Sequence, residues 1–296
     1  MENILTKQFY RQRKDFEDSC AGRDAGLTFP EGVRCSTDIA YADDGIKAHL
    51  LDIYRPEDSQ EKILPVIINV HGGGLIIGNK EFNRYFCALL CKKGFLVYSI
   101  EYRLIPDCLI YDQIADVFMA MDYIKERLAA DGGDSSHVYM AGDSGGACLI
   151  TYANAIQNNT NIARAANVTP SGLRINALGL ISGMFYTSRF DKIGLFLPKY
   201  LYGRDYKKTS FAKYVNPENR ELLNSLAPVW LVTSHNDFLR RYTTDFEKAL
   251  TRAEREHELV VFPKNKKLTH AFSVFEPFLS ESSAVIDMMV EYLRKF

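Results

Sequence analysis

Short runs of apolar and β-branched residues recur along this chain, and longer segments with the period of a helix lie between them. This alternation is typical of a mostly parallel sheet with helices on both faces. The runs at 65–70 and 95–101 are almost entirely apolar, as expected for central strands that are covered twice. The sequence therefore predicts an α/β fold with an eight-stranded sheet. The expected strands are 37–42, 47–54, 65–70, 95–101, 137–142, 176–182, 228–233 and 258–262.

Three of the expected helices carry an apolar stripe at helical spacing, and such a stripe faces the sheet. We interpret these residues as core. They are Ile114, Val117, Phe118, Met121 and Ile124 in the first helix, Tyr242, Phe246, Leu250 and Ala253 in the second, and Val285, Met288, Met289, Tyr292 and Phe296 in the third.

Two segments, 1–35 and 183–225, do not fit the alternation. We expect them to form a small helical cap over the ends of the strands of a catalytic domain at 36–296, because ligands bind at those ends in open α/β sheets. The second segment is rich in aromatic residues, and each of them either lines a pocket or only packs the cap onto the core. They are Phe185, Tyr186, Phe190, Phe196, Tyr200, Tyr202, Tyr206, Phe211 and Tyr214.

Residues 142–146 read GDSGG, which has the G-x-S-x-G form of a strained strand-to-helix turn. Such a turn lifts a serine hydroxyl clear of the sheet, so Ser144 is the expected nucleophile. About seventy residues earlier, 71–74 read HGGG, and a glycine run can bring backbone N–H groups close to a developing oxyanion. Together the two motifs predict a serine hydrolase that cleaves esters.

The oxyanion donors expected from these motifs are the N–H groups of Gly72, Gly73 and Gly145. We expect His71 to brace the glycine loop and Asp143 to brace the turn, rather than to move protons.

A serine nucleophile needs a base and an acid that orients the base. In α/β-hydrolase folds the order along the chain is serine, acid, histidine. Three histidines follow the serine. His257 lies in a charged helix end, and His235 lies in the loop that must supply the acid. His270 follows the last expected strand and is the expected base. The acid should follow the strand 228–233, where Asp237 lies, whereas Asp245 is too far into the next helix.

Two other interpretations of the glycine motifs fail. GDSGG also surrounds the nucleophile of trypsin-like proteases, but their histidine and aspartate precede the serine in an all-β fold. The glycines at 72–74 lack the spacing and the lysine of a phosphate-binding loop.

The composition is that of an ordinary globular protein, with 296 residues, 47% hydrophobic and 25% charged. The net charge of −1 gives no reason to expect nucleic acid as a partner. The six cysteines form no C-x-x-C pair, so no metal site is expected and no cofactor is needed. The first residues lack the apolar segment of a signal peptide and no run is long enough to span a bilayer, so we expect a cytoplasmic protein without membrane insertion. A homodimer is left open.

These residues resemble the hormone-sensitive-lipase-like family of α/β-hydrolase esterases, which includes bacterial acetyl esterases. The resemblance covers about residues 45 to 296. The matching pieces are 51–56 (LDIYRP), 71–74 (HGGG), 102–107 (YRLIPD, against a YRLAPE-type element), Asp116, 142–144 (GDS), 237–239 (DFL) and 270–272 (HAF).

The chain departs from the pattern of that family at several positions. Gly145 stands where the family usually has alanine, and Ala271 replaces a glycine. The acid loop lacks a second aspartate and carries Arg240 and Arg241 instead.

The resemblance implies a carboxylesterase that hydrolyses short- to medium-chain acyl esters, such as acetyl esters, and its partner is then a small-molecule ester. An amidase or formamidase with the same triad, or a ligand-binding protein on the same scaffold, remains the alternative.

Overall fold

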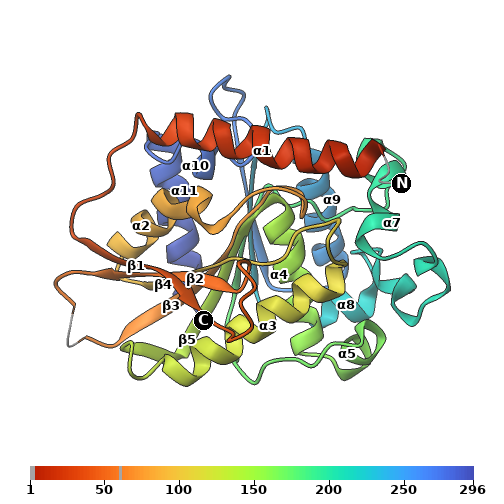
Figure 1. The fold of residues 1–296 in the computed structure, drawn as a ribbon, viewed down its shortest axis with the longest axis horizontal. Coiled ribbons are helices and arrows are strands. Elements are labelled where there is room, and N and C mark those ends of the chain that lie inside the picture. The colour runs from red at the N-terminus through yellow and green to blue at the C-terminus, as the bar shows by residue number, and fades with distance from the viewer. Residues whose placement is uncertain (1–3, 60–61) are drawn as a thin grey trace.

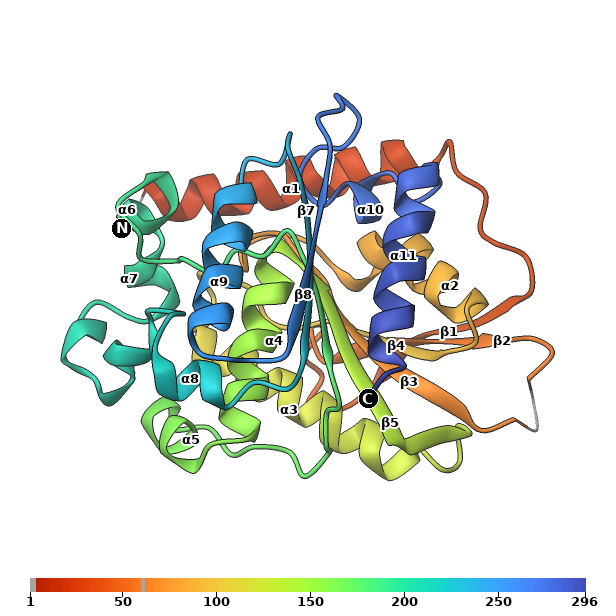
Figure 2. The same ribbon diagram turned by 180° about the vertical axis from the view of Figure 1, so that it is seen from behind.

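A computed structural model describes residues 4–59 and 62–296 of the chain. The eight strands form one sheet in the order β1-β2-β4-β3-β5-β6-β7-β8 (Figures 1 and 2). Strand β2 pairs antiparallel with both β1 and β4, and the other neighbours are parallel. The strands are β1 (Val33–Ala40), β2 (Leu50–Pro56), β3 (Leu64–Val70), β4 (Leu96–Ile100), β5 (Gly133–Asp143), β6 (Leu178–Ile181), β7 (Val229–Ser234) and β8 (His257–Phe262). The predicted eight-stranded α/β fold is confirmed.

The largest differences from the expected strand limits are in β1 and β5. Strand β1 begins at Val33 rather than at 37 because it lies at the sheet edge with most side chains exposed, so it has little apolar pattern. Strand β5 begins at Gly133 rather than at 137 because a polar stretch extends the pairing until Gly133 lies opposite Leu64.

Helices cover both faces of the sheet, and alternate residues of a strand belong to opposite cores. In β7, Val229 and Leu231 pack with α3 (Ile110–Arg127), α4 (Ser144–Gln157) and α9 (Arg240–Arg252). Trp230 and Val232 pack on the other side with α2 (Arg84–Lys92) and α11 (Ser280–Leu293).

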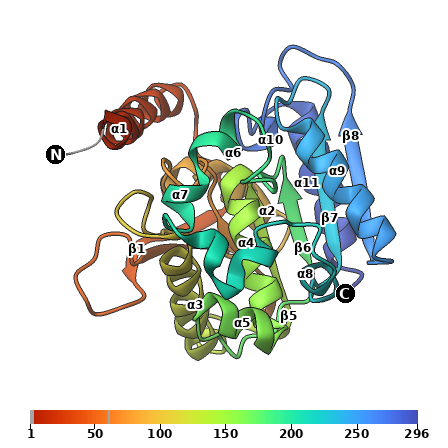
Figure 3. The same ribbon diagram turned by 90° about the vertical axis from the view of Figure 1, so that its right-hand side faces the viewer.

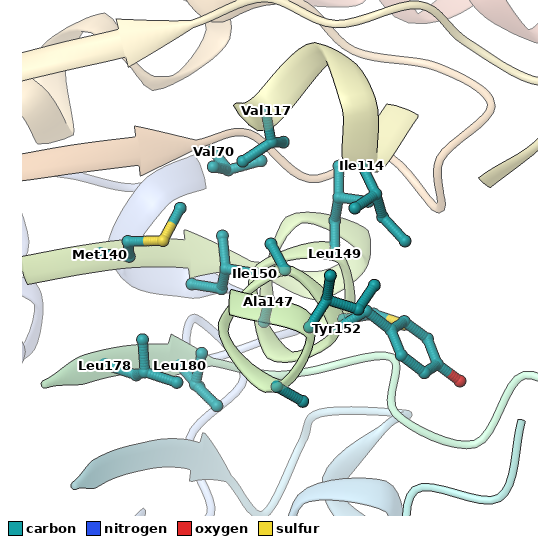
Figure 4. Close-up of a cluster of buried hydrophobic side chains, with 14 of the residues drawn as sticks. Val70, Ile114, Val117, Met140, Ala147, Leu149, Ile150, Tyr152, Leu178 and Leu180 are labelled. Atoms are coloured by element: carbon teal, nitrogen blue, oxygen red, sulfur yellow. The ribbon is translucent and has the colours of Figure 1, made fainter. Parts of the chain in front are cut away.

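The predicted stripes lie in these two cores. Figure 4 shows Ile114 and Val117 of α3 and Ile150 of α4 packed near Val70 and Met140 of the sheet. All stripe residues are buried except Ala253, Met288 and Phe296, which are partly buried at the margin of the cores.

The segment 183–225 folds into short helices rather than one long crossover. Asp191 begins the first of them, because its Oδ1 accepts the N–H groups of Ile193 and Gly194. The elements are α6 (Lys192–Phe196), α7 (Pro198–Leu201), η2 (Tyr206–Lys208), η3 (Ser210–Tyr214) and α8 (Arg220–Asn224). The remaining short elements are η1 (Lys80–Asn83), α5 (Thr160–Ala166) and α10 (Phe272–Phe275).

The N-terminal segment forms one long helix, α1 (Ile4–Asp24), which runs along one side of the molecule in Figures 1 and 2 and is seen end-on in Figure 3. None of the helices in the described ranges is both long and apolar enough to cross a membrane.

Candidate active site

The turn at residues 142–146 has the strained geometry that its sequence predicts. Strand β5 ends at Asp143 and helix α4 begins at Ser144, whose φ angle is +49°. A positive φ is uncommon for a residue other than glycine and marks a position that the surrounding structure enforces. The serine hydroxyl is thereby presented at the carboxyl end of the sheet, inside the largely apolar cavity described below.

The structure brings together the three residues expected to act as nucleophile, base and acid. Ser144 Oγ lies 2.9 Å from His270 Nε2, and His270 Nδ1 lies 2.7 Å from Asp237 Oδ1. An ionised carboxylate can only accept, so Nδ1 carries the proton and donates to Asp237. In the neutral ring Nε2 is therefore free to accept the proton of the serine hydroxyl.

Asp237 is held in place and kept ionised by its neighbours. Its Oδ2 accepts the Thr233 hydroxyl at 2.8 Å, and its Oδ1 accepts the N–H of Leu239 at 2.8 Å. Burial by itself raises the pKa of Asp237, but the hydrogen bond and charge of His270 and the neighbouring donors outweigh burial, so the pKa lies below its ordinary value. A carboxylate in this state can stabilise an imidazolium that forms during a reaction.

Gly72 does not supply an oxyanion donor as expected, and this prediction is corrected. Its N–H donates to Asp143 Oδ1 at 3.0 Å in a buried hydrogen bond, so it is already used. Asp143 also accepts from Asn83 Nδ2 at 2.9 Å. Burial raises the pKa of Asp143, and these two donors offset part of that effect. Asp143 therefore ties the glycine loop to the serine turn.

The glycines near the serine that are candidates for backbone donors are Gly73, Gly74 and Gly145. Gly73 and Gly74 line the cavity together with Ser144, and within the described residues neither N–H donates to another group. The turn packs tightly against this loop, since a Cβ on Gly145 would lie 2.9 Å from the Gly74 nitrogen and 2.8 Å from that of Leu75. Gly74 is therefore a candidate donor in place of Gly72.

His71 contacts both the glycine loop and the YRLIPD element. Its ring stacks on Tyr102 with centroids 4.3 Å apart, and the Tyr102 hydroxyl donates to the His71 carbonyl oxygen at 2.8 Å. Both ring nitrogens face acceptors, since Nε2 lies 2.9 Å from Glu101 Oε1 and Nδ1 lies 2.8 Å from the Gly72 carbonyl oxygen. Burial lowers the pKa of His71, but the charge and hydrogen bond of Glu101 outweigh it and the pKa is raised.

Asp116, which is fully buried in α3, holds the YRLIPD element at 102–107 through hydrogen bonds to Arg103. Asp116 accepts three hydrogen bonds from the Arg103 guanidinium at 2.6 to 3.1 Å, and one from the Arg103 N–H at 3.0 Å. Gln113 of the same helix donates to the carbonyl oxygens of Leu75 and Arg103. The motif that carried the resemblance is therefore a support for the glycine loop.

The two histidines and the aspartate that were not chosen as base or acid have other partners in the structure. His235 contacts Arg240, and His257 contacts Glu247 and Thr251. Asp245 forms an ion pair with Arg189 at 2.8 Å. None of them contacts Ser144, His270 or Asp237 in the described structure.

The serine and histidine open into a cavity of about 500 Å³. Its wall is mostly apolar and is built from α1, the glycine loop, α6 and the loops after β7 and β8. The lining residues are Phe9, Gln12, Phe16, Gly73, Gly74, Ile76, Ile77, Asp143, Ser144, Met184, Lys192, Ile193, Phe196, Leu197, Phe238, Leu239, His270 and Phe275.

Most of the aromatic residues of 183–225 pack the cap onto the core instead of lining the cavity. Phe185 stacks on Phe246 with centroids 4.2 Å apart, and Phe211 packs against Tyr111 and Tyr152. Of the expected aromatic set, Phe196 is the member that lines the cavity described above.

The sequence analysis missed the aromatic residues supplied by α1 and by the acid loop. Phe9 and Phe16 lie seven positions apart, two turns of a helix, and that spacing could have marked one face of α1. Phe238, next to Asp237, is 74% exposed and its ring lies 4.4 Å from that of His270. No pattern in the sequence marks that contact.

Residues 67–273 match a protein family described as the α/β hydrolase fold. A probable isoprenylcysteine alpha-carbonyl methylesterase, ICME, from Oryza sativa subsp. japonica is 29% identical over 184 residues, which are 58% of this chain and 44% of that protein. Esterase LipQ from Mycobacterium tuberculosis (strain ATCC 25618 / H37Rv) is 33% identical over 120 residues, which are 40% of this chain and 28% of that protein. The chain thus spans less than half the length of these curated relatives.

Among solved structures, esterase B from Lactobacillus rhamnosis (HN001) superposes with a TM-score of 0.92 at 22% sequence identity, over 99% of this chain and 95% of that one. Another structure of that esterase is described with a C4-C4 tributyrin phosphonate inhibitor. At this identity the likeness shows that the two proteins share a fold.

Proposed function

This chain belongs to the α/β-hydrolase fold family, and we propose that it is a serine carboxylic-ester hydrolase acting on short- to medium-chain acyl esters. The observation that carries the proposal is the hydrogen-bonded chain from Asp237 through His270 to Ser144, at 2.7 and 2.9 Å. The predicted resemblance to hormone-sensitive-lipase-like esterases is confirmed by the matching family and by relatives that are named esterases.

In the proposed reaction, Ser144 Oγ attacks the acyl carbonyl carbon while His270 Nε2 takes the hydroxyl proton. The carbonyl oxygen gains negative charge and accepts hydrogen bonds from the N–H groups of Gly73, Gly74 and Gly145. Collapse of the tetrahedral intermediate breaks the ester C–O bond, and the imidazolium gives its proton to the leaving alcohol.

Water completes the cycle by the same route. His270 takes a proton from the water as it attacks the acyl-enzyme, and then returns the proton to Ser144 Oγ as the acid leaves. Asp237 stays ionised throughout and stabilises the imidazolium. Activity is expected to fall on acidification, because a protonated His270 cannot accept the serine proton.

The nature of the cavity supports an ester with an apolar part of limited size. A volume of about 500 Å³ lies within the range of pockets for small molecules, roughly 300 to 1,000 Å³. The butyryl-type phosphonate described for esterase B supports a short acyl chain by analogy. The esterase and methylesterase names of the relatives favour an ester over an amide.

The test is an acyl-length series of p-nitrophenyl esters, acetyl through octanoyl, together with a feruloyl ester, on the purified protein. Ser144→Ala should lower kcat by at least about 10³-fold, as loss of a nucleophile does in comparable triads. Ser136→Ala, an exposed serine on β5, is the matched control and should keep wild-type turnover. Wild-type turnover by Ser144→Ala would refute the proposal.

Two further measurements separate the alternatives. The matched anilide should be cleaved far more slowly than the ester if the protein is an esterase rather than an amidase. A fluorophosphonate probe should label the wild type but not Ser144→Ala, whereas a binding protein without catalysis would remain unlabelled.

A further inference from the structure

One face of α1 points at the cavity and carries an arginine among its apolar residues. Phe9, Gln12 and Phe16 line the cavity, and their spacing of three and four positions places them on one side of the helix. Arg13 lies four positions after Phe9 and three before Phe16, so it belongs to the same side. In Figure 1 this helix, coloured red, spans most of the width of the molecule.

Arg13 is bonded to two loops that support the site. Its Nε donates to the Ile76 carbonyl oxygen at 2.8 Å, and its Nη2 donates to the carbonyl oxygens of Leu104 and Ile105 at 3.0 and 2.6 Å. Its Nη1 donates to Asp107 Oδ2 at 2.8 Å. The Arg13 side chain is only 19% exposed and its bonds to the three carbonyl oxygens are partly buried, whereas the bond to Asp107 is exposed.

Of the carbonyl groups that Arg13 holds, that of Ile76 belongs to the segment that follows the glycine run, and those of Leu104 and Ile105 belong to the YRLIPD element at 102–107. The N–H of Ile76 donates to the Gly73 carbonyl oxygen at 3.1 Å, and the N–H of Ile105 donates to that of Leu75 at 3.0 Å. A movement of Ile76 or Ile105 therefore shifts residues 73–75, which carry two of the proposed oxyanion donors. Arg13 is thus two hydrogen bonds away from Gly73.

Arg11 has no comparable role although it is on the same helix. It forms an exposed i, i+4 ion pair with Asp15 at 3.8 Å, and its side chain is 77% exposed. Arg11 points to the opposite side from Arg13 in its contacts, so it provides a matched control on the same element.

We propose that Arg13 is a positioning residue, which fixes the segment 73–76 through Ile76 and Ile105 so that the backbone donors face Ser144. The inference rests on the proposed function, because it concerns the oxyanion site of that reaction. Helix α1 then has two roles, because one of its faces lines the cavity and Arg13 on that face also fixes the loop with the backbone donors. If α1 lost its contacts with the rest of the protein, the cavity would lose part of its wall and the segment 73–76 would lose its hydrogen bonds to Arg13.

The variants Arg13→Ala and Arg13→Lys test this, with Arg11→Ala as control. Arg13→Ala should lower kcat about tenfold or more, because loss of a single oxyanion donor typically costs roughly 10²- to 10³-fold and a displaced loop costs part of that. Arg13→Lys keeps the charge near Asp107 but loses the fork of donors, so its kcat should be intermediate. Arg11→Ala should stay within about twofold of the wild type.

A second readout separates positioning from simple closure of the cavity. A trifluoromethyl ketone forms a tetrahedral adduct with the serine and needs the oxyanion donors, whereas the carboxylic acid product does not. Arg13→Ala should weaken the ketone by the same factor as kcat and change the affinity for the product by less than about twofold. Equal losses for both ligands, or an unchanged kcat, would overturn the proposal.

The rate of fluorophosphonate labelling of Ser144 keeps this test distinct from that of the proposed function. Labelling uses the activated serine and the donors but no ester substrate. If no ester is hydrolysed by the wild type, the proposed function fails, and slower labelling of Arg13→Ala than of Arg11→Ala still supports the role of Arg13. Equal labelling rates in variants that melt like the wild type would refute it. Added guanidinium should restore part of the rate to Arg13→Ala and none to Arg13→Lys.

Discussion

The N–H of Gly72 donates to Asp143 Oδ1 at 3.0 Å, although 71 positions separate the two residues. This bond joins the first glycine of the HGGG loop to the residue that precedes the nucleophile. A buried carboxylate therefore fixes the distance between the HGGG loop and Ser144. The same bond occupies the Gly72 N–H, and for this reason the proposed oxyanion donors are Gly73, Gly74 and Gly145.

Asp143→Ala should reduce both stability and turnover. The substitution leaves the Gly72 N–H buried without an acceptor and leaves Asn83 Nδ2 only its longer bond to Asn69 Oδ1 at 3.4 Å. A buried donor that loses its partner costs about 1–3 kcal/mol. The free energy of unfolding, measured in urea, should fall by about 2 kcal/mol or more, and kcat should fall because the donor loop loses its tether. Unchanged values for both quantities would show that Asp143 does not hold the loop.

Gly145→Ala should lower kcat although alanine is usual at this position in the family that the sequence resembles. A Cβ here would meet the backbone nitrogens of Gly74 and Leu75 at 2.9 and 2.8 Å, and backbone cannot swing aside as a side chain can. We expect a loss of kcat of roughly tenfold, part of the cost of losing one oxyanion donor, with a smaller change in KM.

Gly22→Ala is the matched control for that substitution. A Cβ on Gly22 of α1 would meet nothing within 4 Å, and the residue is helical, so alanine should be neutral or stabilising by about 0.5–1 kcal/mol. Steady-state kinetics of the two variants side by side decide the matter. Full activity of Gly145→Ala would mean that the loop adapts to the added methyl group without moving its donors.

The sequence was sufficient for the features that depend on local pattern. Central strands such as 65–70 are almost entirely apolar, and the G-x-S-x-G turn packs so closely on its neighbours that it requires glycine at 142 and 146, so both could be predicted. The order serine, acid, histidine then selected Asp237 and His270 from several candidates, and the structure places His270 in contact with both Ser144 and Asp237.

The sequence was not sufficient for features that depend on tertiary contact between polar groups. Whether the N–H of Gly72 or of Gly74 is free depends on where the Asp143 carboxylate lies, and no spacing in the sequence contains that information. The role of α1 was also missed in detail. Arg13 lies among other charged residues of a polar helix, and only docking distinguishes it from Arg11.

Glu101→Gln should destabilise the protein most at mildly acidic pH. Glu101 raises the pKa of His71 in the folded state above its ordinary value of 6.5. Because the pKa of His71 is higher in the folded protein than in the unfolded chain, protonation of His71 stabilises the fold. This stabilisation is complete below about pH 6.5, the pKa in the unfolded chain, and it is lost as the pH rises through the pKa in the folded protein.

Urea denaturation of the wild type and of Glu101→Gln at about pH 6, 7.5 and 9 measures this effect. The difference in the free energy of unfolding should be largest at pH 6 and should shrink toward pH 9. Glutamine keeps the shape but only one acceptor oxygen, whereas both oxygens of Glu101 have partners, His71 Nε2 and the Lys80 N–H. The part of the difference that changes with pH therefore reports the charge of His71. A difference that is constant with pH would show that His71 is not stabilised as the cation.

Phe196→Ala should change the acyl-length preference, and Phe190→Ala should not. Both residues belong to the segment 183–225 and are well exposed, at 56% and 91%, so neither truncation should alter the free energy of unfolding by more than about 0.5 kcal/mol. Phe196 lines the cavity beside the serine, whereas Phe190 is not among the described residues that line it.

A longer acyl chain gains about 0.8 kcal/mol for each CH₂ group that it buries, and loss of the Phe196 ring removes part of the surface that buries it. The ratio of kcat/KM for the octanoyl ester to that for the acetyl ester should therefore fall about fivefold to tenfold in Phe196→Ala and stay within twofold in Phe190→Ala. Equal ratios in both variants and the wild type would place the acyl chain elsewhere, against the wall formed by α1 and Phe238.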